Sequence, residues 1–246
     1  MDAETLIAGT VIAFLAAASY SVTGFGFALV ATPLLTLVWD TKSAVVASVL
    51  LSTTALLPLL FEVRGHVNPR RLSVLVAGSF TGIPVGILLL ERLDADALSV
   101  LIATTVIVAT IALYLLPHGL GERDTVAGRF AAGLLGGTLG ASTSMGGPPV
   151  VLYELGREHE IDTFRAGMMA YFLPGNLVTI AGFIIVGRLS TDVLVFFAVA
   201  LPAVLLGLVA GSLARRHIDP VRFRLLVMAL LIGSSLSVIA TSFLDA

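Results

Sequence analysis

Apolar residues run through the chain in stretches of about 20, separated by short polar stretches. A helix of that length crosses a hydrocarbon layer of about 30 Å. Eight such segments can be marked, near residues 5–39, 43–61, 72–90, 97–116, 126–156, 164–186, 191–213 and 221–243. The connections between them are too short for a separate soluble domain. The pattern therefore predicts an all-α integral membrane protein with one multi-pass transmembrane domain.

Two of the segments, 5–39 and 126–156, are longer than one crossing requires. Both also contain residues that interrupt an apolar helix, in "TGFGFALVATPLL" and in "GASTSMGGPPVV". Backbone that leaves helical geometry at membrane depth has unpaired N–H and C=O groups, so it persists only inside protein or beside a watery cavity. We therefore expect segments 1 and 5 to be broken or hairpin-like, with each break at an internal site.

The two halves of the chain share spacings that indicate a duplicated unit. Gly24 stands nine residues before Pro33, as Gly140 does before Pro149. "VRGH" after segment 2 matches "IVGR" after segment 6, and paired small residues recur in segments 3 and 7, at Gly82, Gly86, Gly207 and Gly211. These matches predict an N-terminal repeat over residues 1–120, with segments 1 to 4, and a C-terminal repeat over 121–246, with segments 5 to 8.

The basic residues indicate how the halves are oriented, because Lys and Arg tend to remain cytoplasmic. If every segment crosses once, the 14 basic residues divide six against eight. If segments 1 and 5 return to the side they entered from, Lys42, Arg92 and Arg188 lie on one side and the other eleven on the opposite side. Each half then crosses three times, so the two repeats are inverted and both termini are non-cytoplasmic. Inverted repeats with discontinuous helices are a recurrent architecture of secondary transporters.

Composition supports the membrane assignment and excludes several functions. Hydrophobic residues make up 57% of the chain and charged residues 12%, with a net charge of -2. The charge gives no nucleic-acid footprint, and the absence of cysteine removes disulfides and thiolate metal sites. The four histidines lie in loops and no phosphate-binding GxxxxGK[ST] motif is present. We predict no enzymatic activity, cofactor or metal, and no cleaved signal peptide, because Asp2 and Glu4 precede the first segment without a basic residue.

The break in segment 5 has the features of an anion site. Pro148 and Pro149 are tolerated in the first turn of a new helix, whose N-terminus has free N–H groups and about half a positive charge. Hydroxyl side chains near both breaks can donate to an oxyanion. With Gly65 aligned to Gly187, Thr54 falls opposite Asn176. The predicted substrate-binding residues are Ser21, Thr23, Gly24, Gly26, Thr54, Ser142, Thr143, Ser144, Gly146, Gly147 and Asn176.

Other polar and small residues have simpler interpretations. The glycine pairs in segments 3 and 7 are typical of helix packing. Hydroxyls such as those of Ser48, Ser52, Thr53, Ser79 and Thr81 more often bond to a carbonyl of their own helix than to a ligand. No ionisable residue lies in the middle of a segment, which disfavours an intramembrane hydrolase and a buried proton relay.

With eight segments in two halves, "GFGFALVATPLL" and "GLLGGTLGASTSMGGPPVVLY" resemble the TauE/SafE family of sulfite and organosulfonate exporters. The most specific element is Gly146, Gly147, Pro148 and Pro149, while Phe25 and Phe27 stand where smaller residues are often seen. The resemblance implies export of a small sulfur-containing anion, such as sulfite, sulfoacetate or a related sulfonate, across the cytoplasmic membrane. A passive anion channel and a non-transporting membrane subunit are the alternatives, and a homo-oligomer is left open. The expected partners are the anion and the lipid bilayer, with no nucleic acid.

Overall fold

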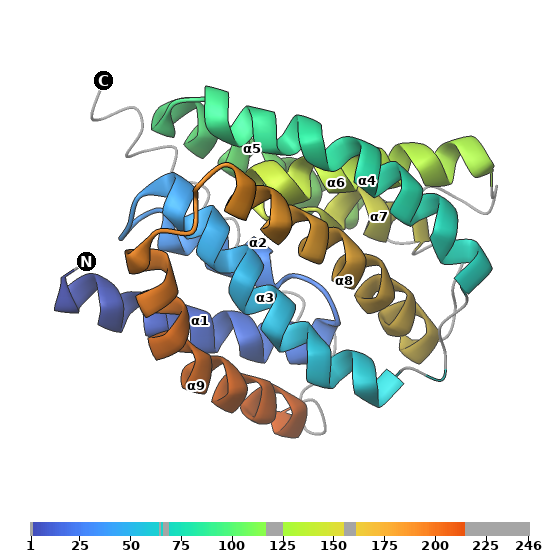
Figure 1. The fold of residues 1–246 in the computed structure, drawn as a ribbon. Helices are drawn as coiled ribbons and strands as arrows, with labels where there is room; N and C mark the ends of the chain where they lie inside the picture. Colours follow the sequence, from blue (N-terminus) through green and yellow to red (C-terminus); the bar gives the residue numbers. More distant parts are fainter. Residues whose placement is uncertain (1, 64, 66–68, 117–124, 155–160, 215–246) are drawn as a thin grey trace.

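The computed structural model describes residues 2–63, 65, 69–116, 125–154 and 161–214, and this part of the chain is helical with no strand. The helices are α1 (Ala3–Thr23), α2 (Phe27–Leu35), α3 (Thr41–Val63), α4 (Pro69–Arg92), α5 (Ala95–Leu115), α6 (Val126–Thr143), α7 (Gly147–Glu154), α8 (Ile161–Ile185) and α9 (Thr191–Ala214). Figure 1 shows them as one bundle, with the short α2 and α7 among longer helices. The eighth predicted segment, 221–243, lies outside the described residues.

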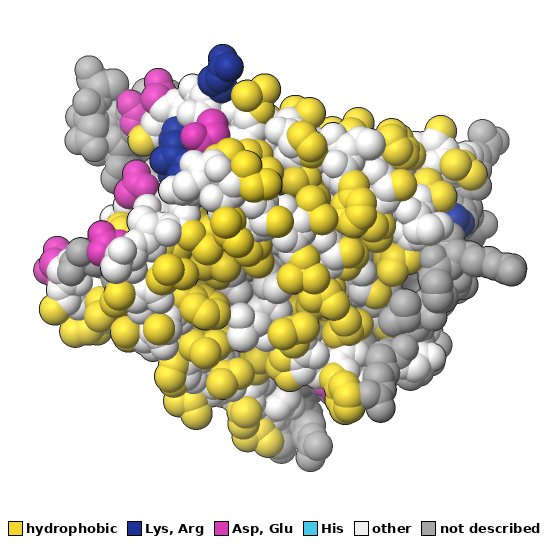
Figure 2. Space-filling model, viewed as in Figure 1, with side chains coloured by type: hydrophobic (Ala, Val, Ile, Leu, Met, Phe, Trp, Pro, Cys, Tyr) yellow, Lys and Arg dark blue, Asp and Glu magenta, His cyan; other side chains and the backbone are white. Residues whose placement is uncertain are grey.

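Six of the described helices are long and apolar enough to cross a membrane, namely α1, α3, α4, α5, α8 and α9. Large apolar side chains face outward on them; Ile7, Phe61 and Ile185, for example, are 66%, 67% and 84% exposed. Figure 2 shows most of the charged side chains of this face at the end where the N-terminus lies, and hydrophobic side chains over much of the rest of the face. A surface of this kind is suited to lipid, so the protein is a multi-pass membrane protein.

The first predicted break is present, and it turns the chain back on itself. Asp2 caps the start of α1, where its carboxylate accepts from the Thr5 backbone N–H at 2.9 Å, and Gly24, with φ of 76°, caps its end. Gly26, also left-handed with φ of 104°, precedes α2. The Thr5 hydroxyl donates to the carbonyl of Val38 at 3.2 Å. Because this bond joins the start of α1 to the chain just after α2, the segment is a helical hairpin.

The second predicted break has the same form. α6 ends at Ser144, with φ of 65°, and α7 begins at Gly147, close to the expected start at Pro148. The Tyr153 hydroxyl, near the end of α7, donates to the carbonyl of Thr125 at 2.9 Å, and Thr125 is the N-cap of α6. This segment is therefore a second hairpin whose two ends also lie together.

The positions of the two turns correct the expected alignment of the breaks. Gly24 and Ser144, not Gly24 and Gly140, are the left-handed residues, and each backbone N–H bonds to the carbonyl four residues earlier. Gly140 lies within α6, so the matched Gly and Pro spacing is displaced by one helical turn. The reason is that a left-handed cap does not require glycine, since a short polar residue such as Ser144 can adopt it.

The glycine pairs of segments 3 and 7 pack helices together, as the simpler interpretation predicted. A Cβ at Gly82 or Gly86 would stand 2.1 or 2.3 Å from a carbonyl oxygen of α6. At Gly207 and Gly211 the corresponding distances to carbonyl oxygens of α1 are 2.4 and 2.3 Å. The α4–α6 and α1–α9 seams are therefore close backbone-to-backbone contacts.

These seams divide the bundle into two groups of helices. α1, α2, α3 and α9 pack together, as do α4, α6, α7 and α8, and α3 packs against α8 between the groups. Each group takes helices from both halves of the sequence. A space between the groups is therefore lined by both hairpins.

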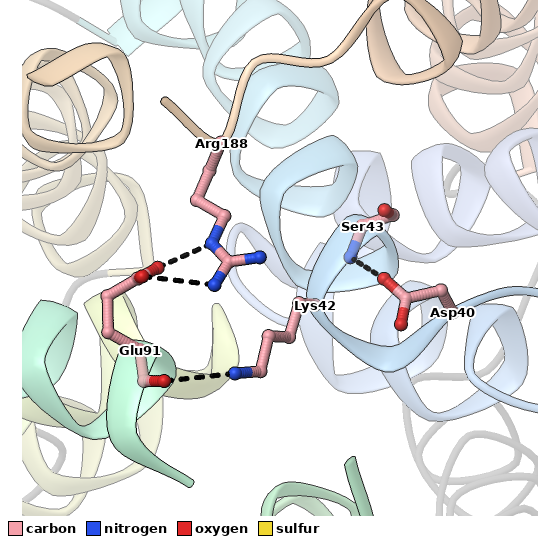
Figure 3. Close-up of polar contacts among 5 residues, drawn as sticks. All are labelled: Asp40, Lys42, Ser43, Glu91 and Arg188. Atoms are coloured by element: carbon pink, nitrogen blue, oxygen red, sulfur yellow. Dashed lines mark hydrogen bonds and ion pairs between the residues drawn. The ribbon is translucent and has the colours of Figure 1, made fainter. Parts of the chain in front are cut away.

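Lys42, Arg92 and Arg188 lie at one end of the bundle, as the hairpin interpretation requires. Glu91, at the end of α4, binds both Arg188 and Lys42 (Figure 3). Its carboxylate accepts two bonds from the Arg188 guanidinium, one of them 3.0 Å long between Nη2 and Oε2, and its carbonyl accepts from Lys42 Nζ at 3.1 Å. This polar cluster joins the start of α3 to α4 and to the turn between α8 and α9.

Candidate functional site

A small cavity lies where the two hairpins approach each other. Its volume is about 40 Å³. Gly26, the N-cap of α2, and Gly147, the first residue of α7, both line it. Two helix N-termini therefore border one space, and each contributes partial positive charge and backbone N–H groups. The remaining lining residues are Tyr20, Phe27, Ala28, Leu29, Ser52, Ser144, Met145, Phe172 and Asn176.

A second cavity, of about 20 Å³, continues from the first into the α4, α6 and α8 side of the site. Ser144, Phe172 and Asn176 line both. The others that line the second are Ser79, Ile83, Gly136, Gly137, Gly140, Gly146, Tyr171, Gly175 and Thr179. The lining residues of α8 recur every three or four positions, so one face of that helix is turned toward the site.

Five of the predicted site residues line these cavities. They are Gly26, Ser144, Gly146, Gly147 and Asn176. Asn176 was expected on a weakened helix after Pro174, but α8 runs without a break from Ile161 to Ile185. A proline within a membrane helix removes one backbone bond, and neighbouring helices can compensate for the loss.

The other predicted site residues lie elsewhere. The hydroxyls of Ser142 and Thr143 donate to carbonyls within α6, at 2.8 and 2.7 Å, and that of Thr54 donates to Leu50 at 3.1 Å. Ser21 and Gly24 lie beside the side chain of Arg165 and line neither cavity. Thr23 ends α1, and its side chain lies outside the described part of the structure.

Ser144 differs from the neighbouring hydroxyls because it follows the helix instead of belonging to it. Its Oγ is buried, and none of the described residues forms a hydrogen bond with it. A buried hydroxyl without a partner is unfavourable by roughly 1 to 3 kcal/mol. Since Ser144 lines both cavities, its proton is available to a ligand there.

Ser52 shows why a back-bonded hydroxyl can still line a site. Its Oγ donates to the Val49 carbonyl at 3.0 Å, which confirms the simpler interpretation for this residue, as do the bonds of Thr53 to Val49 and of Thr81 to Gly78. Ser52 nevertheless lines the larger cavity. Because its proton is already used, Ser52 presents lone pairs and not a donor to that space.

The two adjacent glycines of the second break have different surroundings. A Cβ at Gly146 would lie 2.4 Å from the carbonyl oxygen of Gly136, so Gly146 is required for packing. A Cβ at Gly147 would meet only the ring of Phe172, at 3.4 Å. Gly147 can therefore carry a side chain without a backbone clash, and that side chain would enter the cavity.

The burial of one charged residue was not predicted. Arg165 stands at the start of the predicted segment 164–186 and was counted among the eleven basic residues of one side, but it lies within α8 and is only 2% exposed. It falls two residues after the start of the membrane-spanning stretch at Thr163, where the hydropathy pattern does not show whether a side chain faces water or protein.

Comparisons with known proteins found sequence similarity along most of the chain. A family model described as sulfite exporter TauE/SafE matches residues 9–238. The chain is also 26% identical, over 231 residues, to a protein of Cupriavidus necator named "Probable sulfite/organosulfonate exporter TauE". That alignment covers 90% of this chain and 89% of the relative. No solved structure matches the chain.

Proposed function

The chain belongs to the sulfite exporter TauE/SafE family, and on that basis we propose that it is a secondary transporter that exports a small sulfur-containing anion across the cytoplasmic membrane. The substrate is sulfite or an organosulfonate, as the name of the Cupriavidus necator relative suggests for that protein. The protein acts by binding and moving this anion, without catalysing its conversion. Binding needs no cofactor or metal.

The observation that carries this proposal is the meeting of the α2 and α7 N-termini at one cavity. Both ends border the space that Ser144 and Asn176 also line. At α7 the available N–H groups are those of Gly146, Gly147 and Val150, because Pro148 and Pro149 have none. Helix N-termini favour anions through these groups and through the helix dipole. Asn176 adds amide donors and Ser144 adds a hydroxyl, so an oxyanion can be coordinated by neutral groups from both hairpins.

The size of the site favours a small anion. A cavity of about 40 Å³ can hold roughly three water-sized groups, at 10 to 15 Å³ for each. Sulfite, with four heavy atoms, is on this scale. The adjoining space of about 20 Å³ leaves room for a short substituent on sulfur. A long-chain sulfonate would require the lining residues to move.

Similar packing in the two halves supports two inverted repeats, residues 1–120 and 121–246. α1 packs against α9 through Gly207 and Gly211, while α6 packs against α4 through Gly82 and Gly86. Both hairpins close by a bond between their two ends. We propose that the helix groups move relative to one another about the anion, and that the end carrying Lys42, Arg92 and Arg188 is non-cytoplasmic.

Efflux of sulfite from proteoliposomes tests the function. Purified protein should release trapped sulfite with saturable kinetics, and organosulfonates should compete. Chloride should compete weakly, because a single atom has no separate oxygens with which to reach donors on both hairpins. Flux that rises linearly with sulfite concentration would indicate a channel instead. No flux, together with no thermal shift on addition of sulfite, would indicate a non-transporting subunit.

A further inference from the structure

Arg165 is the largest fully buried side chain in the described part of the protein. It lies just inside the membrane-spanning stretch of α8, which begins at Thr163. A charged side chain at such a position is costly, and one that is retained there commonly belongs to a ligand site or a transport path. A buried cation close to the anion site would add a long-range attraction to the neutral donors that line the cavities.

The position of Arg165 on α8 relates it directly to the cavity. It precedes Phe172 by seven residues and Asn176 by eleven, which are about two and three helical turns. All three therefore share one face of α8. The rise of about 1.5 Å per residue places the Cα of Arg165 roughly 10 Å before Phe172 along the helix axis, on the side opposite the polar cluster of Glu91.

The side chain of Arg165 extends to the turn of the first hairpin. Its Nη2 donates to the carbonyl of Ser21 at 3.4 Å, and its Cγ lies against Gly24, where a Cβ would be 2.6 Å away. Tyr20, the residue before Ser21, lines the larger cavity. Gly26, two residues beyond Gly24, lines that cavity too. The guanidinium is thus beside the hairpin turn that forms one wall of the site.

We propose that Arg165 is a specificity-determining residue, whose positive charge raises the electrostatic potential at the cavity and favours doubly charged over singly charged anions. This inference rests on the proposed function. The guanidinium keeps its charge in any protein environment, and the bond to Ser21 uses only one of its five N–H donors. The attraction at a given distance is proportional to the charge of the anion, and salt screens it little because the group is buried.

A purely structural role makes a different prediction. The bond to Ser21 satisfies one carbonyl at the C-terminal end of α1, where a cation is also favoured by the helix dipole. If that were the whole role, loss of Arg165 would weaken the binding of all anions by the same factor. The ratio of two affinities therefore separates the roles where a single affinity does not.

The test measures binding of two probes to purified protein by calorimetry. Sulfite above neutral pH is mainly a dianion, and methanesulfonate is a monoanion that carries the same SO₃ group. In Arg165→Gln, sulfite affinity should fall roughly tenfold and methanesulfonate affinity roughly threefold, because the two energies scale with charge. Arg165→Lys should keep the wild-type ratio. Arg188→Gln, which removes a cation at the opposite end, should also keep it.

The other possible results distinguish failure of the role proposed for Arg165 from failure of the proposed function. Equal losses for the two probes, or no loss, would overturn the role of Arg165 while leaving the proposed function intact. If the wild type binds neither probe, the proposed function fails first. If the wild type binds sulfite but not methanesulfonate, the monoanionic probe becomes hydrogensulfite, whose binding is measured below neutral pH. Arg165→Met is the second uncharged variant; if Arg165→Lys folds and neither uncharged variant does, the charge is needed for folding and the proposal is wrong.

Discussion

Gly24 and Ser144 end their helices in the same way but offer a ligand different chemistry. Both have left-handed backbones, with φ of 76° and 65°, and both cap a helix through the backbone N–H. Gly24 has no side chain, whereas Ser144 places an unpartnered hydroxyl at both cavities. At the level of single residues the proposed site is therefore asymmetric, with more donors from the second hairpin.

Replacing Asn176 with Leu tests the amide contact. Loss of a hydrogen bond to a charged ligand is worth roughly 1.5 to 3 kcal/mol, so we expect sulfite affinity to fall at least about tenfold. Expression and melting temperature should stay near wild type because Asn176 is half-buried beside a cavity. Thr54→Val is the matched control, since that hydroxyl bonds within α3. Unchanged calorimetric affinity in Asn176→Leu would remove this residue from the site.

Ser144→Gly should separate binding from stability. Glycine adopts the left-handed region without the cost of roughly 1 kcal/mol that Ser144 carries, and the change also removes a buried unpartnered hydroxyl. We therefore expect a higher melting temperature together with weaker sulfite binding. Ser142→Ala, which deletes a hydroxyl bonded to Thr138, should leave affinity unchanged. Wild-type affinity in a more stable Ser144→Gly protein would show that this hydroxyl does not contact the anion.

Side-chain direction limited what could be predicted about single residues. Ser142, Thr143 and Ser144 are adjacent and chemically alike, so composition could not distinguish them. The hydroxyls of Ser142 and Thr143 donate to carbonyls of α6, to which both residues belong. Ser144 is the residue after the helix, and its hydroxyl does not form such a bond. A helix end is uncertain by one or two residues from sequence, which is enough to change which hydroxyl faces a cavity.

The helical hairpins are the elements that the sequence predicted best. Glycine and proline within overlong apolar runs located both breaks, because irregular backbone in a membrane needs an internal site. The second break was placed correctly, with α7 beginning at Gly147 beside the expected Pro148, but the pairing of Gly24 with Gly140 was wrong by four residues, since the cap at Ser144 has no glycine to mark it. The burial of Arg165 was not predicted, because an apolar run gives no sharp point at which a helix enters the membrane.

Two glycine variants test the difference between a cavity wall and a packing seam. Gly147→Val should fold, because a Cβ there meets only Phe172 at 3.4 Å, but it should abolish sulfite binding by filling the cavity. Gly207→Ala should lower stability by roughly 1 to 3 kcal/mol, because its Cβ would lie 2.4 Å from the Phe14 carbonyl oxygen. Melting temperature and affinity are measured on the same samples. A folded Gly147→Val protein with wild-type affinity would mean that the anion binds elsewhere.

For the whole molecule, the charge distribution gives an orientation that can be tested directly. The native chain has no cysteine, so single cysteines can be labelled without background. Asp96 and Gly65 are both exposed and lie at opposite ends of the bundle, at the start of α5 and after α3. A membrane-impermeant maleimide should label Asp96→Cys in intact cells and Gly65→Cys only after permeabilisation. The reverse pattern would invert the proposed topology.

The α1–α9 seam also has a consequence for how the protein is made. Ala18 of α1 contacts Gly211 of α9, so partners that touch in the bundle are separated by most of the chain. At a synthesis rate of roughly 5 to 20 residues per second, the first helix waits roughly 10 to 40 seconds before its partner has been translated. During that interval the small-residue face of α1 has only lipid, the membrane insertion machinery or a second nascent chain to cover it. A translational pause anywhere between α1 and α9 lengthens this interval, whereas α4 waits only until α6 has been translated.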